Sequence, residues 1–387
     1  MSSAAPSSNR RLLVLYVIAV CLYWAAQYVF VPTLSVYVES KAASLASVGA
    51  VLSMYGLWQA IVRLPLGIVA DWVGRRKPFI IAGFAFAGLG AVVMGMATGV
   101  PGLTLGRAFT GVAASSWVLL VVAFSALFPP EDAVRASSIL SAINALARMV
   151  ATGVTGSLNA LGGYTLPLYV AAVLAVLAIV AMLPVRERRH QNTPPTLRQI
   201  GTLIVRRDVL VPSLLGVVAQ YAIWASTFSF ATNLAKNLGA SDVVLSALVS
   251  MNIGLVFLGN LAMSLLARRV SSRWMVALSF VFIVLGLGAL TVAKGLPMVF
   301  VGQILLGLAS GVGYPVMMGL SIRYVDNGQR ATAMGLFQAV YAIGMFAGPW
   351  LSGILADAMG IQPMFAVTAA VCLVLGLGGT SLLAAKD

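Results

Sequence analysis

Twelve apolar runs, each about as long as a bilayer is thick, constrain this sequence more than any other feature. A bilayer-spanning helix needs about 20 mainly apolar residues. Only 9% of the 387 residues are charged, whereas a soluble domain carries about 25%. The sequence therefore predicts an all-α integral membrane protein with twelve transmembrane helices, at residues 12–38, 46–70, 78–99, 101–127, 136–162, 165–184, 209–234, 243–267, 274–293, 297–322, 331–356 and 363–384.

The basic residues are divided unevenly between the connectors on the two sides of the membrane. If both termini lie on one side, eighteen of the 24 Lys and Arg residues share that side, and only Lys41, Lys236 and Lys294 lie on the other. Because positively charged connectors stay in the cytoplasm, we expect both termini to be cytoplasmic. The multi-pass protein is expected in the plasma membrane, as in a bacterial inner membrane. The net charge of +14 is explained by this rule, so no nucleic-acid partner is expected.

The chain divides into two similar halves. A cytoplasmic tail (1–11) precedes a six-helix bundle (12–184), a basic cytoplasmic linker (185–208) and a second six-helix bundle (209–387). The segments "LGRAFTGVAAS" (105–115) and "VGQILLGLASG" (301–311) match at an offset of 196 residues. Two parallel repeats are typical of transporters that bind their solute near the membrane midplane.

Two motifs in the first half carry a resemblance to a known family. The pattern G-x-x-x-D-x-x-G-R-[RK] occurs after the second run, at Gly67, Ala70, Asp71, Gly74, Arg75 and Arg76. A second, different motif lies in the fourth run and contains Arg107 and Gly111. With its twelve runs and duplicated halves, the whole chain resembles the major facilitator superfamily (MFS), in its drug and metabolite efflux branch. The resemblance implies a secondary active transporter that works by alternating access.

The first motif is the expected gate. The resemblance implies that Asp71 makes a charge-assisted contact that holds one conformation closed and breaks in the other. Glycine permits the tight turn that a connector of two or three residues demands. The alternative is that the basic residues only anchor the connector to the inner surface. The expected gating residues are Gly67, Asp71, Gly74, Arg75 and Arg76.

Charges inside the apolar runs are all positive. The ten acids lie at run ends, in connectors or in the tail, whereas Arg63, Arg107 and Arg148 lie within runs. An intramembrane arginine normally faces a cavity and marks function. Each could instead pair with backbone carbonyls or fill a polar contact between helices. Without an acid to neutralise them, we expect an anionic or strongly hydrogen-bond-accepting solute.

Polar and aromatic residues at helical spacing complete the expected solute site. Asn144 and Arg148 share a polar stripe of the fifth run, and the resemblance implies that the first, fourth, seventh and tenth helices line the cavity. The expected binding and translocation residues are Tyr23, Gln27, Gln59, Arg63, Arg107, Asn144, Arg148, Gln220, Trp224, Asn252, Gln338 and Tyr341.

The apolar runs lack the residues that an enzyme or a metal site would need. No histidine or acid pair lies in a run, and both cysteines lie in apolar surroundings, so we expect no enzyme, no metal and no cofactor. The expected function is export of drugs or metabolites, with organic-anion uptake or exchange as the alternative and a channel or membrane sensor as a remote one. Antiport and symport both stay open, as does a proton as coupling ion. A monomer is expected.

Overall fold

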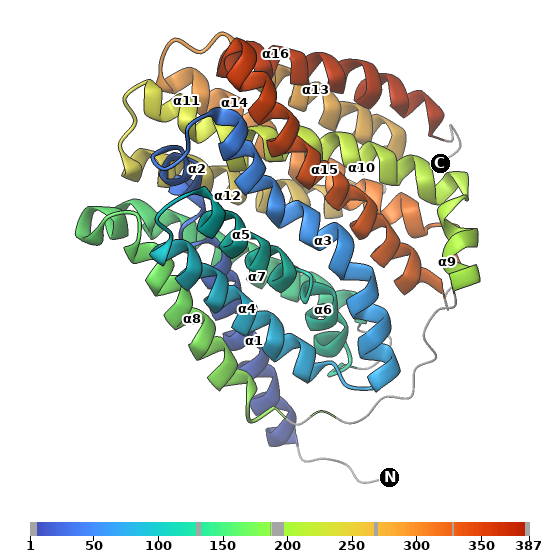
Figure 1. The fold of residues 1–387 in the computed structure, drawn as a ribbon. Coiled ribbons are helices and arrows are strands. Elements are labelled where there is room, and N and C mark those ends of the chain that lie inside the picture. The colour runs from blue at the N-terminus through green and yellow to red at the C-terminus, as the bar shows by residue number, and fades with distance from the viewer. Residues whose placement is uncertain are drawn as a thin grey trace.

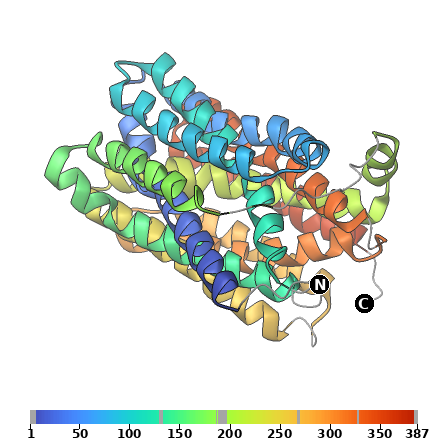
Figure 2. The ribbon, with the colours of Figure 1, turned by 90° about the horizontal axis from the view of Figure 1, so that it is seen from below.

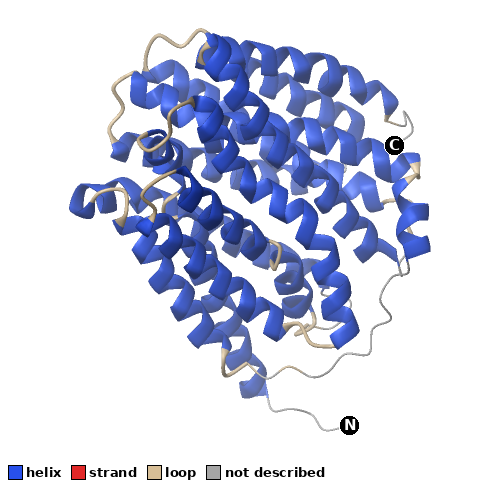
Figure 3. Ribbon diagram, in the orientation of Figure 1, coloured by secondary structure: helices blue, strands red, loops and turns tan. Residues whose placement is uncertain are grey.

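The structure is a bundle of long helices. The computed structural model describes residues 6–128, 133–185, 187, 197–266, 270–326 and 329–383, and within these ranges it contains helices and no strand (Figure 3). The all-α prediction is thereby confirmed. Residues 1–5, and residues 186 and 188–196 of the linker, lie outside the described residues, and the exact boundaries of the two halves stay a prediction.

The helices form two groups in chain order, blue to green and yellow to red in Figure 1. The first half comprises α1 (Pro6–Tyr28), α2 (Val31–Glu39), α3 (Leu45–Val73), α4 (Lys77–Met96), α5 (Val100–Ala114), α6 (Trp117–Ser125), α7 (Ala133–Gly162) and α8 (Leu166–Met182). The second half comprises α10 (Arg207–Ala225), the π-helical segment η2 (Ser226–Phe230), α11 (Ala231–Asn237), α12 (Asp242–Leu266), α13 (Ser272–Thr291), α14 (Leu296–Ile322), α15 (Arg330–Met359), α16 (Ile361–Val371), the π-helical η4 (Cys372–Leu377) and the 3₁₀ segment η5 (Gly378–Leu382).

The expected membrane spans coincide with these helices. Within the described residues, eleven helical stretches are long and apolar enough to cross a membrane, and the sixth expected run is the shorter apolar helix α8. With 17 residues, α8 reaches the lower limit for a span. The short helix α9 (Leu197–Ile204), which the sequence analysis did not anticipate, lies at the edge of the bundle (Figure 2).

Four of the described spans depart from a continuous α-helix near their middle, and in the last of them the π-helical η4 follows α16. The first breaks between α1 and α2, where Pro32 lies in the first turn of α2 and lacks an N–H donor. The fourth breaks between α5 and α6 at Ser115 and Ser116. The seventh contains η2, a π-helical turn of the kind that often occurs at functional sites.

Glycine contacts repeat between the halves and confirm the internal duplication. A Cβ on Gly106 of α5 would lie 2.7 Å from the carbonyl oxygen of Gly90 on α4, and one on Gly302 of α14 would lie 3.0 Å from that of Gly286 on α13. Gly286 follows Gly90, and Gly302 follows Gly106, by the same 196 residues that relate the two halves of the sequence. Small residues let membrane helices approach closely, so the same close helix pair was kept in each half.

The halves are joined by polar contacts at one end of the bundle, which we term the sealed end. It carries the connectors after Glu39, Met96 and Asn237. Here Ser35 and Thr232 share a 2.7 Å hydrogen bond, the amide of Asn233 donates to Glu39, and Asn159 donates to Asp242 at 3.0 Å.

At the opposite end, which carries the Gly74 turn and which we term the open end, α3 and α15 have parted. Gly49, Gly56 and Gly67 lie on one face of α3. A Cβ on Gly49 would meet the carbonyl oxygen of Pro349 at 2.2 Å, and one on Gly56 would meet Met345 at 2.4 Å, whereas one on Gly67 would meet no atom of the described residues within 4 Å. The ribbons of α3 and α15 also diverge toward this end in Figure 1. The two helices therefore touch from the sealed end to about the middle of the bundle.

We predict that Gly49→Ala destabilises the protein. The added methyl group would overlap the α15 backbone, and overpacking of this kind costs about 1–3 kcal/mol. Gly67→Ala is the matched control on the same helix face, where the methyl group has room. Thermal unfolding in detergent should show a lower midpoint for Gly49→Ala only, and equal midpoints would contradict the packing described.

Candidate functional site

A buried guanidinium lies at the centre of the first half. Arg107 on α5 is 2% exposed, and its Cζ atom lies 4.2 Å from the ring centre of Tyr55 on α3. Its Nη1 atom donates a long hydrogen bond of 3.4 Å to Thr110 one turn along the same helix. The aromatic ring therefore compensates in part for the hydration that this enclosed cation has lost.

Neutral polar side chains of α1 border Arg107. The amide of Gln27 donates to the carbonyl oxygen of Thr110 at 3.1 Å and to the hydroxyl of Tyr23 at 3.3 Å. Tyr23 in turn donates to the carbonyl oxygen of Ala113 at 2.6 Å. Both side chains occupy the carbonyls around the α5–α6 break, as buried polar groups require partners.

Arg63 joins the two halves near the middle of α3. Its Nη1 atom donates to the hydroxyl of Tyr341 at 3.0 Å and to the carbonyl oxygen of Gln338 at 3.5 Å, both on α15, and Nη2 donates to the side chain of Gln59. It is 4% exposed. In this conformation Arg63 therefore makes a polar contact between helices, which was the alternative to a role in solute binding.

Arg148 on α7 is the only half-buried member of the three. Its Cζ atom lies 4.0 Å from the ring centre of Tyr28 and 5.9 Å from that of Trp24, both on α1. One turn earlier on the same helix face, the buried side-chain oxygen of Asn144 has no hydrogen-bond partner among the described residues.

Aromatic rings connect the surroundings of Arg107 and Arg148 through the second half. Tyr55 stacks on Trp224 of α10 with ring centres 5.0 Å apart, and Trp224 lies 4.8 Å from Phe228 of η2. Phe228 packs edge-on against Tyr28 at 6.2 Å. The two cations therefore lie at the ends of one chain of aromatic contacts that crosses between the halves.

Within the part of the chain that the structure describes, no carboxylate pairs with these cations. The ion pairs among the described residues join Arg76 to Asp71, Arg206 to Asp208 and Lys236 to Asp242. In each of Arg63, Arg107 and Arg148 the buried Nε atom lacks a hydrogen-bond partner among the described residues. A buried charge without a counter-charge is strongly unfavourable, so this arrangement can accept an anion.

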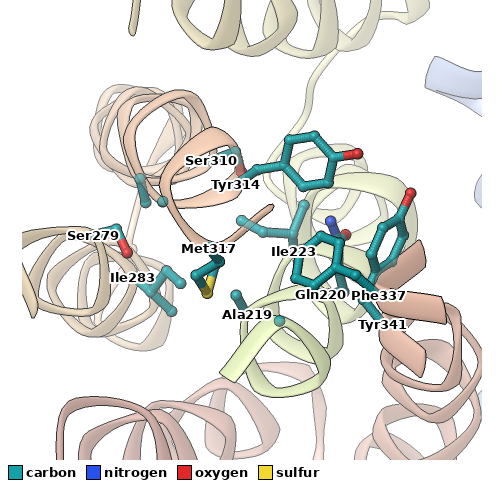
Figure 4. A pocket seen from close by; sticks show the side chains of 13 residues that line it. Ala219, Gln220, Ile223, Ser279, Ile283, Ser310, Tyr314, Met317, Phe337 and Tyr341 are labelled. Atoms are coloured by element: carbon teal, nitrogen blue, oxygen red, sulfur yellow. The ribbon is translucent and has the colours of Figure 1, made fainter. Parts of the chain in front are cut away.

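A small cavity lies beside this region in the second half, between α10, α13, α14 and α15 (Figure 4). Its volume of about 20 Å³ has room for one water molecule. Gln220 and Tyr341 line it, together with Tyr314, and the hydroxyls of both tyrosines point away from its apolar interior in Figure 4. Because Tyr341 also contacts Arg63, the cavity adjoins the contact between the halves.

One expected binding residue lies elsewhere. Asn252 on α12 donates to the backbone and side-chain oxygens of Gln303 on α14, at 2.9 and 3.1 Å, and Thr227 donates to the same side-chain oxygen at 2.9 Å. These bonds occupy the amide group of Asn252 inside the second half. The other expected residues surround the arginines or the cavity.

Two aromatic residues of the site, Tyr55 and Phe228, were not anticipated from the sequence. Tyr55 packs against Arg107, and Phe228 packs against Tyr28. The only sequence signal for Tyr55 is that it precedes Arg63 by eight residues on the same helix. For Phe228 the sequence contains no such signal.

The expected gate forms a compact turn at the open end. Gly74 ends α3 with a left-handed φ of 70°, and its N–H donates to the carbonyl of Ala70 at 3.0 Å. Arg76 pairs with Asp71 at 3.1 Å within the same turn, while Arg75 is exposed. The carboxylate of Glu187, just after α8, accepts from the backbone N–H groups of Arg76 and Lys77 at 2.7 and 2.9 Å. Here Asp71 thus pairs inside its own connector, and Glu187 is a partner that sequence analysis did not anticipate.

Comparison with known sequences identifies the family. The sequence profile of the Major Facilitator Superfamily matches residues 16–232 and 212–386. The chain belongs to this superfamily. It is a multi-pass membrane transporter of the MFS type, and the family and fold are those of proteins that are not enzymes.

Two curated relatives match along most of their length. An uncharacterized MFS-type transporter of Methanocaldococcus jannaschii is 21% identical over 89% of this chain and 91% of its own. The transcription regulatory protein OpdE of Pseudomonas aeruginosa is 26% identical over 92% of this chain and 90% of its own.

Solved transporter structures share the fold. A bacterial homolog to the human lysosomal transporter Spinster, in an inward-facing and unoccupied conformation, superimposes with a TM-score of 0.82 at 14% identity, covering 98% of both chains. The human organic anion transporter MFSD10 superimposes with a TM-score of 0.68 at 16% identity, covering 98% of this chain and all of that one.

We predict that Tyr341→Phe lowers thermal stability. The change removes a buried hydrogen bond to a charged group, which contributes about 1.5–3 kcal/mol. Tyr324→Phe is the control, because Tyr324 is 56% exposed at the open end. Unfolding midpoints in detergent should fall for Tyr341→Phe alone, and two unchanged midpoints would show that Arg63 does not depend on this contact.

Proposed function

We propose that this transporter carries a small organic anion by alternating access. The observation that carries the proposal is the set of three embedded arginines without a carboxylate partner among the described residues. A bound anion would supply the missing counter-charge and accept charge-assisted hydrogen bonds. Cationic drugs would meet like charge at the same place, which disfavours the drug-export expectation.

Arg148 is the proposed anion anchor. It is half-buried, whereas Arg63 and Arg107 are 4% and 2% exposed. Its guanidinium rests on Tyr28, and its Nε atom has no partner among the described residues. A planar guanidinium that stacks on a ring keeps its in-plane donors free for a carboxylate. The organic anion transporter among the similar structures supports this class of solute by analogy of fold only.

The open end is the proposed cytoplasmic end. It carries Arg75, Arg76 and Lys77, and positively charged connectors stay in the cytoplasm. The conformation would then be inward-facing, as in the similar Spinster homolog. Asp71 and its turn would serve as the inner gate in the opposite conformation, with Gly67 providing the space for α15 to approach.

The direction of transport and the coupling ion stay predictions. Export of a metabolite anion is compatible with this site, and so is uptake or exchange. None of the described acids contacts the three arginines. Glu39 and Asp242, which join the halves at the sealed end, are the acids to test if transport proves to be proton-coupled.

A membrane sensor is the second candidate, because one relative is named as a transcription regulatory protein. Counterflow in proteoliposomes separates the two functions. A carrier exchanges labelled solute against unlabelled solute and saturates, whereas a sensor binds the same anion without flux.

We predict that Arg148→Gln weakens stabilisation by anions. A ligand that binds only the folded state raises its stability by mass action, and loss of a charge-assisted hydrogen bond of about 1.5–3 kcal/mol lowers affinity about 10- to 150-fold. Organic anions and their uncharged amides should be screened by thermal unfolding. Arg323→Gln is the matched control, since Arg323 also lies over a tyrosine ring, at 5.3 Å from Tyr324, but is exposed.

The proposal fails if cations and neutral solutes stabilise the protein while anions do not. It fails equally if the response to anions is the same in Arg148→Gln as in the unmodified protein.

A further inference from the structure

We propose that the transported anion is an aromatic carboxylate, with its carboxylate on Arg148 and its ring against Phe228 of the second half. This inference rests on the proposed function and adds the chemical class of the solute's body. It also assigns Phe228 as a residue that determines specificity.

The head-group position is formed by two donors of the first half. The Cζ atom of Arg148 lies 4.0 Å from the ring centre of Tyr28, and its Nε atom has no hydrogen-bond partner among the described residues. The indole nitrogen of Trp24, a residue only 6% exposed, is buried without a hydrogen-bond partner among the described residues. Trp24 also neighbours Arg148 at 5.9 Å. Two donors on neighbouring side chains, both without a partner among the described residues, suit the two oxygens of a carboxylate.

The surroundings of this head-group position are aromatic on both sides. Trp117 of α6 lies edge-on to Trp24 with ring centres 5.3 Å apart, and Phe228 lies 6.2 Å from Tyr28. Trp117 and Phe228 are both half-buried, unlike Trp24 and Tyr28. Two rings with accessible surface flank the anchor, and ring edges and faces favour an aromatic partner over an aliphatic one of equal size.

Phe228 would tie the solute to the second half. It belongs to the π-helical segment η2, which interrupts the helix between α10 and α11. Arg148, Trp24 and Trp117 all belong to the first half. A carboxylate held by the first half and a ring held by the second would make one molecule contact both, so that occupancy depends on how the halves are arranged.

Three probes of similar size separate the contributions of charge and ring. Benzoate has both, cyclohexanecarboxylate keeps the charge without the aromatic ring, and benzamide keeps the ring without the charge. Isothermal titration of the purified full-length protein should give benzoate at least five-fold tighter binding than cyclohexanecarboxylate. Benzamide should bind at least ten-fold more weakly than benzoate.

Phe228→Leu should abolish the preference for benzoate while leaving the affinity for cyclohexanecarboxylate within about two-fold, since leucine keeps an apolar contact but no ring. Phe282→Leu on α13, also half-buried, is the matched control and should keep the preference. Arg148→Gln should weaken binding of both carboxylates at least ten-fold.

The possible failures are distinguishable. If both carboxylates bind equally and depend on Arg148, the aromatic inference is wrong and the anion carrier stands. If benzoate and benzamide bind equally, or no carboxylate binds, both proposals fall. The comparison of probes on the unmodified protein decides the inference even if Phe228→Leu does not fold.

Discussion

The rest of this structure depends on how positive charge is held inside the membrane. A guanidinium removed from water needs a counter-charge or dense polar contacts. Arg107 has a tyrosine ring and one long hydrogen bond, and Arg148 has the faces of Tyr28 and Trp24. Cation–π contacts of this kind contribute up to about 2 kcal/mol when desolvated, whereas leaving a buried charge without its ionic partner costs about 3–5 kcal/mol. The incomplete compensation is what makes the site receptive to an anion.

The buried positive charge of Arg63 is held by the contact between the two halves. Its partners Tyr341 and Gln338 belong to α15, and it lies where α3 and α15 begin to part. An anion bound nearby would compete with these neutral acceptors for the guanidinium. Binding at the midplane and the arrangement of the halves are thereby coupled, because a ligand shifts a conformational equilibrium only by its different affinity for the two states. Such coupling requires no acid in the membrane.

The helical architecture and the position of the arginines inside the spans could be predicted from the sequence, but the side chains that contact these arginines could not. Span positions follow from local hydropathy, and the duplication follows from Gly106 and Gly302, whose contacts with α4 and α13 repeat. The arginines were visible because charge is rare in an apolar run. Tyr55, Phe228 and Glu187 were missed because each acts across elements far apart in the chain. Nothing in a single sequence tells which of many membrane aromatics faces a cation.

The central claim is that Arg63, Arg107 and Arg148 have no counter-charge among the described residues, and supplying one inside the protein tests it most directly. Asn144 lies one turn before Arg148 on α7, with its buried oxygen unpartnered among the described residues. Asn144→Asp places a carboxylate of the same shape at a spacing that favours an ion pair. The measurement is thermal unfolding of this variant in the absence and presence of benzoate. We expect a higher midpoint without ligand and no further rise with it. A lower midpoint together with an undiminished response to benzoate would contradict the claim.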